Sequence, residues 1–115
     1  INKMVSSIKS LLVKNNIECT CYGRIKHLSS IYNKLQNKAQ TLKNIYDIAA
    51  TRILVNSVSE CYAVLGIVHA NFTPVDGRFK DYIANPKPNG YKSLHTTVYY
   101  QNEFFEIQIT FMITF

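Results

Sequence analysis

Residues 93–109 read SLHTTVYYQNEFFEIQI, and this stretch decides the fold because it contains two alternating segments around a polar turn. Apolar and polar residues alternate from Ser93 to Tyr100 and again from Phe104 to Ile109, which is typical of half-buried strands. Gln101 and Asn102 lie between the two segments. The pattern predicts an antiparallel hairpin with a two-residue turn.

The hairpin fixes which side chains share a face of the sheet, since neighbouring residues of a strand point to opposite faces. With a two-residue turn, Thr97 lies opposite Glu106 and His95 lies opposite Gln108. We expect these four side chains on one polar face. Three apolar residues of the second strand then point into the core: Phe105, Ile107 and Ile109.

Residues 77–97, GRFKDYIANPKPNGYKSLHTT, enter the first strand of this hairpin and carry groups that suit a nucleotide. Three cations could donate hydrogen bonds to phosphate oxygens: Arg78, Lys80 and Lys87. Four residues indicate a tight turn: Pro86, Pro88, Asn89 and Gly90. Tyr91 follows that turn, where a base could stack on its ring. Each residue is ordinary when taken singly, so the interpretation depends on the whole segment.

Length and charge are consistent with one soluble domain that binds an anion. The chain has 115 residues, 47% of them apolar, and a net charge of +6. The positive charge gathers in two segments, +5 over residues 24–43 and +3 over residues 78–95. This clustering favours a polyanionic partner over a solvated basic face. No apolar run approaches the ~18 residues of a membrane span and no signal peptide opens the chain, so we expect a cytoplasmic protein.

The spacing of the cysteines and histidines does not indicate a metal site. Cys19, Cys21 and Cys61 form no CxxC pair, so we expect reduced, buried thiols. His69 ends a predicted helix and is expected to be structural. His95 shares its strand face with Glu106 and could contact phosphate.

The remaining segments predict helices and strands in a mixed order. We expect a helix at 2–15, a strand at 17–22, a helix at 24–35, a loop at 36–43, a helical turn at 44–50, a strand at 51–55, a helix capped by Ser57 and Glu60, and a loop at 71–77. The apolar face of the capped helix comprises Val58, Cys61, Leu65 and Val68. This order predicts an α+β fold with a mixed β-sheet flanked by helices.

The predicted helix at 24–35 would present a basic face. At ~100° per residue, Lys26, Ser30 and Lys34 fall on the side opposite its apolar stripe, where they could meet phosphates.

Two carboxylates stand out beside these cations: Asp47, just before the strand that contains Arg52, and Glu106. Phosphoryl or pyrophosphoryl transfer needs a divalent metal held by carboxylates, cations around the phosphates and a group that activates the attacking hydroxyl. The chain has a candidate for each of these roles. Arg52 could instead form an ion pair with Asp47.

Five blocks of sequence occur in a fixed order along the chain. They are GRIKHLSSIYNK at 23–34, DIAATRI at 47–53, CYAVLGIVH at 61–69, the segment at 77–97 and EIQI at 106–109. In this order they closely resemble the synthetase domain of the RelA/SpoT family, enzymes that make the alarmones (p)ppGpp. The resemblance covers residues 22–108, and it is far more specific than any single glycine-rich motif.

The resemblance implies a nucleotidyltransferase-like sheet and a GTP pyrophosphokinase, which transfers pyrophosphate from ATP to the 3′-hydroxyl of GTP or GDP. It implies that ATP is bound by Arg24, Lys26, Lys34, Arg52 and Arg78. It implies that the guanine nucleotide is bound by Lys80, Lys87, Asn89, Tyr91 and His95. The implied cofactor is Mg²⁺, held by Asp47 and Glu106, with Glu106 also accepting the proton of the 3′-hydroxyl.

The pattern departs from the family after Ile109, where the family has Arg-Thr and this chain has Thr110 and Phe111. We therefore expect residues 1–115 to be a partial synthetase domain that lacks the family's terminal helix and its hydrolase domain. A catalytically impaired nucleotide-binding remnant of the same fold and a basic RNA-binding module stay open as rivals. The expected partners are ATP and GTP or GDP, without a membrane or nucleic acid, and an oligomer stays open.

Overall fold

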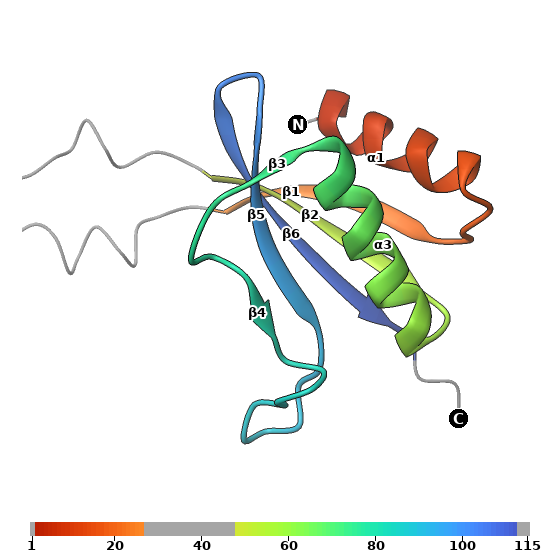
Figure 1. Cartoon of the computed structure of the whole chain (residues 1–115), viewed down its shortest axis with the longest axis vertical. Helices are drawn as coiled ribbons and strands as arrows, with labels where there is room; N and C mark the ends of the chain where they lie inside the picture. The colour runs from red at the N-terminus through yellow and green to blue at the C-terminus, as the bar shows by residue number, and fades with distance from the viewer. Residues whose placement is uncertain (1, 27–47, 113–115) are drawn as a thin grey trace, which may run out of the picture.

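The computed structural model describes residues 2–26 and 48–112 of the chain. Its elements, in chain order, are α1 (Asn2–Lys14), β1 (Thr20–Lys26), β2 (Ile48–Val55), α3 (Val58–Asn71), β3 (Thr73–Pro74), β4 (Lys80–Asp81), β5 (Leu94–Tyr100) and β6 (Glu103–Phe111). Figure 1 shows the strands as one twisted sheet, with α1 and α3 together on one of its faces.

The sheet has the strand order β1-β2-β6-β5-β3, and the short strand β4 also pairs with β5. Strands β2 and β6 run parallel, whereas every other pair in the described residues is antiparallel. The prediction of an α+β fold with a mixed sheet and flanking helices is therefore confirmed.

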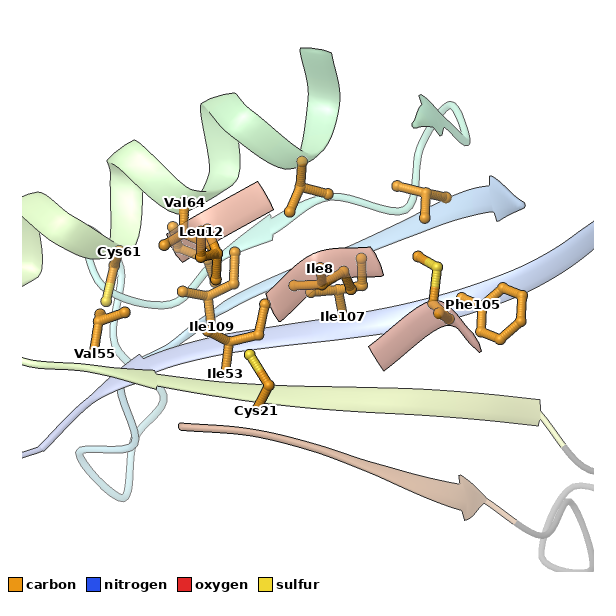
Figure 2. Close-up of a cluster of buried hydrophobic side chains, with 14 residues drawn as sticks. Ile8, Leu12, Cys21, Ile53, Val55, Cys61, Val64, Phe105, Ile107 and Ile109 are labelled. Atoms are coloured by element: carbon orange, nitrogen blue, oxygen red, sulfur yellow. The ribbon is translucent and has the colours of Figure 1, made fainter. Parts of the chain in front are cut away.

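The core lies between the two helices and one face of the sheet (Figure 2). Its helical members recur every three or four residues, which places them on one side of each helix: Met4, Ile8 and Leu12 on α1, and Cys61, Val64 and Val68 on α3. The strands contribute alternate residues: Ile53 and Val55 on β2, and Phe105, Ile107 and Ile109 on β6. Full burial of one such large side chain contributes about 1.5–3 kcal/mol relative to exposure. The predicted inward face of β6 is confirmed.

The β5–β6 hairpin has the register that the sequence predicts. Thr97 pairs with Glu106 and His95 pairs with Gln108. Gln101 and Asn102 both adopt positive φ, 51° and 65°, as a two-residue turn of the mirror-image type requires. Asparagine tolerates this conformation better than most residues, so the turn is locally encoded.

The predicted helix at 24–35 is wrong at its start, and the predicted helical turn at 44–50 is wrong at its end. Residues 24–26 complete β1 and residues 48–50 begin β2, and the two segments pair with each other. This long-range pairing overrides the helical spacing of the local sequence. The rest of both predictions, together with the loop at 36–43, lies outside the described residues.

The strand predicted at 17–22 begins later, at Thr20, because the residues that follow helix α1 first cap its C-terminal end. Asn16 adopts a left-handed φ of 60°, and the Ile17 amide donates to the Leu12 carbonyl over 2.9 Å. This is a common way to satisfy the last carbonyls of a helix. The predicted helix at 2–15 is confirmed as α1.

Helix α3 begins where the capping signal predicts. The Glu60 amide donates to the Ser57 hydroxyl over 3.3 Å, and that hydroxyl donates to the Glu60 carboxylate over 3.0 Å. The predicted apolar face needs correction, because Val64 is fully buried while Val58 is exposed and Leu65 only partly buried. Within the loop predicted at 71–77, Thr73 and Pro74 form β3.

Candidate functional site

A pocket of about 450 Å³ lies on the face of the sheet opposite the helices. Its lining comes from the segment before β4 and from the two hairpin strands: Gly77, Arg78, Lys80, His95, Thr96, Thr97, Glu106, Ile107 and Gln108. The volume falls within the ~300–1,000 Å³ range of small-molecule sites. The structure thus brings together four residues proposed from the sequence, namely Arg78, Lys80, His95 and Glu106.

The alternation of the hairpin explains why polar groups converge here. Leu94, Thr96 and Val98 of β5 are buried toward the helices, so His95 and Thr97 project to the other face. Glu106 and Gln108 of β6 project there for the same reason, and the hairpin register pairs the two sets. A carboxylate, an imidazole and an amide therefore share one wall of the pocket.

The cationic wall of the pocket follows a tight turn. The Arg78 amide donates to the Val75 carbonyl over 3.4 Å, and Gly77 within this turn has a φ of +77°. A residue with a Cβ would be strained at that φ, so the glycine is required by the backbone. The chain then enters β4, where Lys80 pairs with His95 of β5.

Arg52 on β2 adds a cation next to Gln108, one of the polar residues of β6 that line the pocket. It pairs with Gln108 in the parallel β2–β6 ladder, and its Nε and one terminal nitrogen donate to Gln108 Oε1 over 3.4 and 3.2 Å. The alternative ion pair with Asp47 lies outside the described residues. Sequence reasoning did not identify Gln108 as the partner of Arg52, because only the β2–β6 pairing brings them together.

Tyr91 lies beside the pocket and is connected to it through His95. The Tyr91 hydroxyl and His95 Nε2 are 3.2 Å apart, and their rings meet edge to face with centroids 5.8 Å apart. The predicted turn before Tyr91 is confirmed: the Gly90 amide donates to the Lys87 carbonyl over 2.8 Å, and Asn89 Oδ1 accepts from the Tyr91 amide over 3.0 Å. Lys87, Asn89 and Tyr91 are thus grouped next to the lining residues rather than among them.

Tyr82 is a member of this group that sequence reasoning missed. Its ring packs edge to face on His95, with centroids 5.2 Å apart, and Lys87 Nζ lies 4.7 Å from the Tyr82 ring centroid. Lys87 Nζ also lies 5.8 Å from the centroid of the Tyr91 ring. Two tyrosine rings therefore attract one ammonium group, an arrangement worth about 0.5–1 kcal/mol at an exposed site. The sequence signal was its place within the aromatic and basic segment 77–97.

The other proposed site residues are described only in part. Asp47 and Lys34 lie outside the described residues. Arg24 and Lys26 lie in β1, where Arg24 pairs with Ala50 and Ala50 in turn pairs with Glu106 on β6. The helical face proposed for Lys26 and Lys34 is therefore wrong for Lys26, which belongs to a strand.

The described residues contain no cluster of three potential metal-ligating His, Cys, Asp or Glu side chains. Glu106 is the carboxylate that lines the pocket, and carboxylate oxygens are common ligands of Mg²⁺ in proteins. The second proposed ligand, Asp47, directly precedes β2 in the sequence, and Ala50 of β2 pairs with Glu106. The donor chemistry of Glu106 therefore fits a divalent cation, with the second carboxylate still a prediction.

The thiols and His69 lie on the side of the sheet that the helices cover. Cys21 and Cys61 are free and buried, and burial raises the pKa of Cys21 to about 12 and that of Cys61 to about 11. Cys19 is only partly buried, in contrast to the prediction. His69 Nε2 lies 2.7 Å from the Thr96 hydroxyl, and burial lowers the pKa of this imidazole. The buried thiols therefore belong to the core, whereas His69 contacts Thr96, one of the residues that line the pocket.

Comparison with known proteins gives a consistent result. The family model described as the region found in RelA / SpoT proteins matches residues 23–113. A guanosine-3′,5′-bis(diphosphate) 3′-pyrophosphohydrolase of Spiroplasma citri is 45% identical over 111 residues, which are 95% of this chain and 15% of that protein. A GTP pyrophosphokinase of Haemophilus influenzae is 45% identical over 98 residues, which are 85% of this chain and 13% of that protein.

Solved structures show the same fold. The small alarmone synthetase 1 of Bacillus subtilis, bound to its product pppGpp, superposes with a TM-score of 0.76 at 30% identity, covering 97% of this chain and 66% of that one. The same synthetase bound to AMPCPP gives a TM-score of 0.64 at 26% identity, covering 96% of this chain and 64% of that one. The chain thus spans about 13–15% of the length of these two curated relatives and about two thirds of these structures.

None of the helices in the described residues is long and apolar enough to cross a membrane.

Proposed function

Because the chain belongs to the RelA/SpoT family, we propose that its pocket binds ATP and a guanine nucleotide and supports pyrophosphate transfer to the 3′-hydroxyl of GTP or GDP. The observation that carries the proposal is the convergence of Arg78, Lys80, His95 and Glu106 on one pocket. Cations from the segment before β4 and from β4 line the pocket together with the imidazole of His95 on β5 and the carboxylate of Glu106 on the adjacent strand β6. This is the chemistry that transfer between phosphate esters needs.

The names of the relatives support this reaction class. They include GTP pyrophosphokinases and a small alarmone synthetase bound to pppGpp, although pyrophosphohydrolases occur among them as well. We favour synthesis over hydrolysis because the residues of the pocket match the blocks that resemble the synthetase domain.

In the proposed reaction, the 3′-oxygen of the guanine nucleotide attacks the β-phosphorus of ATP. The bond from that phosphorus to the oxygen bridging it to the α-phosphorus breaks, and AMP leaves. Glu106 takes the proton of the 3′-hydroxyl as the new bond forms. Arg78 and Lys80 donate to phosphate oxygens and offset their charge. Mg²⁺, when held by Glu106 and Asp47, would neutralise the phosphate charge further.

The two nucleotides are proposed to occupy different sides of Glu106. Lys80, His95 and the neighbouring Tyr91 group (Tyr82, Lys87, Asn89 and Tyr91) would bind the guanine nucleotide, with the base stacked on Tyr91. Arg52, on the β2 side of Gln108, would bind ATP together with Arg24, Lys26 and Lys34, and Arg78 would contact the ATP phosphates from the segment before β4. The row from Lys80 through His95 and Gln108 to Arg52 gives this arrangement a continuous polar floor.

A direct assay tests the proposal. The purified chain is incubated with magnesium, ATP labelled at the γ-phosphate, and GTP or GDP, and the products are separated by chromatography. We expect label to enter the guanine nucleotide with one AMP released per transfer. Absence of magnesium should abolish the transfer.

The rivals predict different results in the same preparation. Binding of ATP and GTP without any transfer would favour the impaired nucleotide-binding remnant. Salt-dependent binding of RNA, with no preference for guanine nucleotides over others, would favour the basic RNA-binding module. Failure to bind either nucleotide would contradict the proposed function.

A further inference from the structure

A hydrogen bond ties helix α3 to the segment that lines the pocket. The Tyr62 hydroxyl donates to Asp81 Oδ2 over 2.8 Å. Tyr62 is 39% exposed, but its neighbour Cys61 is fully buried and fixes this end of α3 on the sheet. Tyr62 therefore offers Asp81 a donor with a well-defined position.

The same carboxylate closes the turn that follows it. Asp81 Oδ1 accepts from the Ile83 amide over 3.0 Å and from the Ala84 amide over 2.8 Å. The Ala84 amide contributes most to holding the pKa of Asp81 below its usual value, and the Tyr62 hydroxyl acts in the same direction. Each of these bonds favours the charged carboxylate, so Asp81 accepts all three as an anion at neutral pH.

The residues around Asp81 alternate between the helix and the pocket. Arg78 and Lys80 line the pocket. Phe79 lies with its ring centroid 6.3 Å from that of His69, which is two turns beyond Tyr62 on α3. Asp81 likewise turns toward α3. Helix α3 thus contacts Phe79 and Asp81, whereas Arg78 and Lys80 of the same segment line the pocket.

From this alternation we infer that Tyr62 and Asp81 are a positioning pair that sets Lys80 and Tyr82 in the guanine-nucleotide site. Asp81 lies between these two residues: Lys80 pairs with His95, and the Tyr82 ring packs on His95. Neither Tyr62 nor Asp81 lines the pocket, so the pair acts through its neighbours. This inference rests on the proposed function for the identity of the ligand. The effect of the hydrogen bond between Tyr62 and Asp81 on the neighbouring segment can be measured without a ligand.

Two substitutions test the two sides of the hydrogen bond between Tyr62 and Asp81. Tyr62→Phe removes the hydroxyl and keeps the ring, whereas Asp81→Asn keeps an acceptor for the Ile83 and Ala84 amides but removes the charge. Tyr99→Phe serves as the matched control, because Tyr99 is 43% exposed and lies at the far end of β5. Calorimetry measures GTP and ATP affinity for each variant, and hydrogen exchange measures the Ile83 and Ala84 amides.

We expect Tyr62→Phe to weaken GTP binding about three- to tenfold, the size of one partly exposed hydrogen bond. ATP affinity and the melting temperature should stay close to those of the parent. The double variant should lose no more than the worse single variant, since both remove the same interaction. Exchange at Ile83 and Ala84 should be faster in both single variants and unchanged in Tyr99→Phe.

Unchanged exchange at these amides in Tyr62→Phe would overturn the inference, and so would a GTP affinity equal to that of the control. Equal loss of ATP and GTP affinity with a lower melting temperature would also overturn it, since that pattern marks a merely structural bond. A parent chain that binds no GTP would contradict the proposed function instead. The exchange measurement would then still decide whether the tie exists.

Discussion

The two faces of the sheet are built from the same strands but carry different chemistry. On β6, Phe105, Ile107 and Ile109 are buried beneath the helices, while Glu106 and Gln108 line the pocket on the opposite side. Neighbouring residues of one strand thus serve different purposes: one packs in the core and stabilises the fold, and the next lines the pocket and serves the proposed function. Substitutions on the two faces should therefore change different measurements.

The largest effect is expected on the open face, at Glu106. Replacing Glu106 with Gln keeps the shape of the side chain but removes the charge that would accept the proton and bind the metal. Turnover should fall by about 10²–10⁴-fold, the usual loss for a positioned base, while GTP binding persists. Steady-state kinetics and calorimetry on the same preparation measure both quantities.

Glu103→Gln provides the matched control, because Glu103 is exposed on the same strand but outside the pocket lining. It should leave turnover unchanged. Near-parent turnover with Gln at position 106 would falsify the catalytic role of Glu106.

On the helix-covered face, Ile109 should matter for stability instead. Ile109 is fully buried, so Ile109→Ala should lower the free energy of unfolding by about 2–5 kcal/mol through lost burial and the cavity left behind. Urea unfolding followed by circular dichroism measures this loss. Val13→Ala, at a position that is 72% exposed on α1, should change it by much less. Equal losses in the two variants would remove the distinction between the faces.

A smaller effect is expected at Tyr91, beside the pocket. Tyr91→Ala should weaken GTP binding by about 1–3 kcal/mol, the size of a lost stacking contact, and leave ATP affinity nearly unchanged. Tyr91→Phe keeps the ring but removes the contact of the hydroxyl with His95, and should retain most of the affinity. If calorimetry shows equal losses for both nucleotides, the assignment of Tyr91 to the guanine base is wrong.

The smallest effect concerns pH and His69 on the helix-covered face. Burial holds the pKa of His69 below its usual value of 6.5, so the unfolded chain binds a proton more readily than the folded protein. The stability that the neutral imidazole provides is complete above pH 6.5 and is lost as pH falls through the lower folded pKa. The melting temperature should therefore fall more steeply between pH 7 and pH 5 in the parent than in His69→Gln. Parallel curves would show that His69 contributes nothing to the pH dependence.

Local patterns in the sequence predicted the hairpin and its two faces correctly. Alternation and a two-residue turn suffice to place Glu106 opposite Thr97, because both strands and the turn lie within residues 93–109. The capping signal at Ser57 is also local, and it correctly predicts the start of α3.

What the sequence could not predict depends on contacts between distant residues. Residues 24–26 begin a segment whose apolar residues have helical spacing, but these three residues form a strand because they pair with residues 48–50. The bonds from Arg52 to Gln108 and from Tyr62 to Asp81 likewise require the sheet to be assembled first. No local pattern identifies such partners, because spacing along the chain says nothing about which strand lies next to β2.

The position of β6 within the sheet determines when the pocket can first exist during synthesis. In the described residues, β1 and β2 join the rest of the sheet solely through β6, although β6 follows every other strand in the sequence. A ribosome releases these segments in chain order, so β2 has no partner on its inner edge until Phe111 has emerged. A nascent chain therefore carries an unfinished sheet with an exposed edge, which is prone to association with other chains. Glu106 arrives with that same strand, so completion of the sheet and assembly of the pocket are a single event.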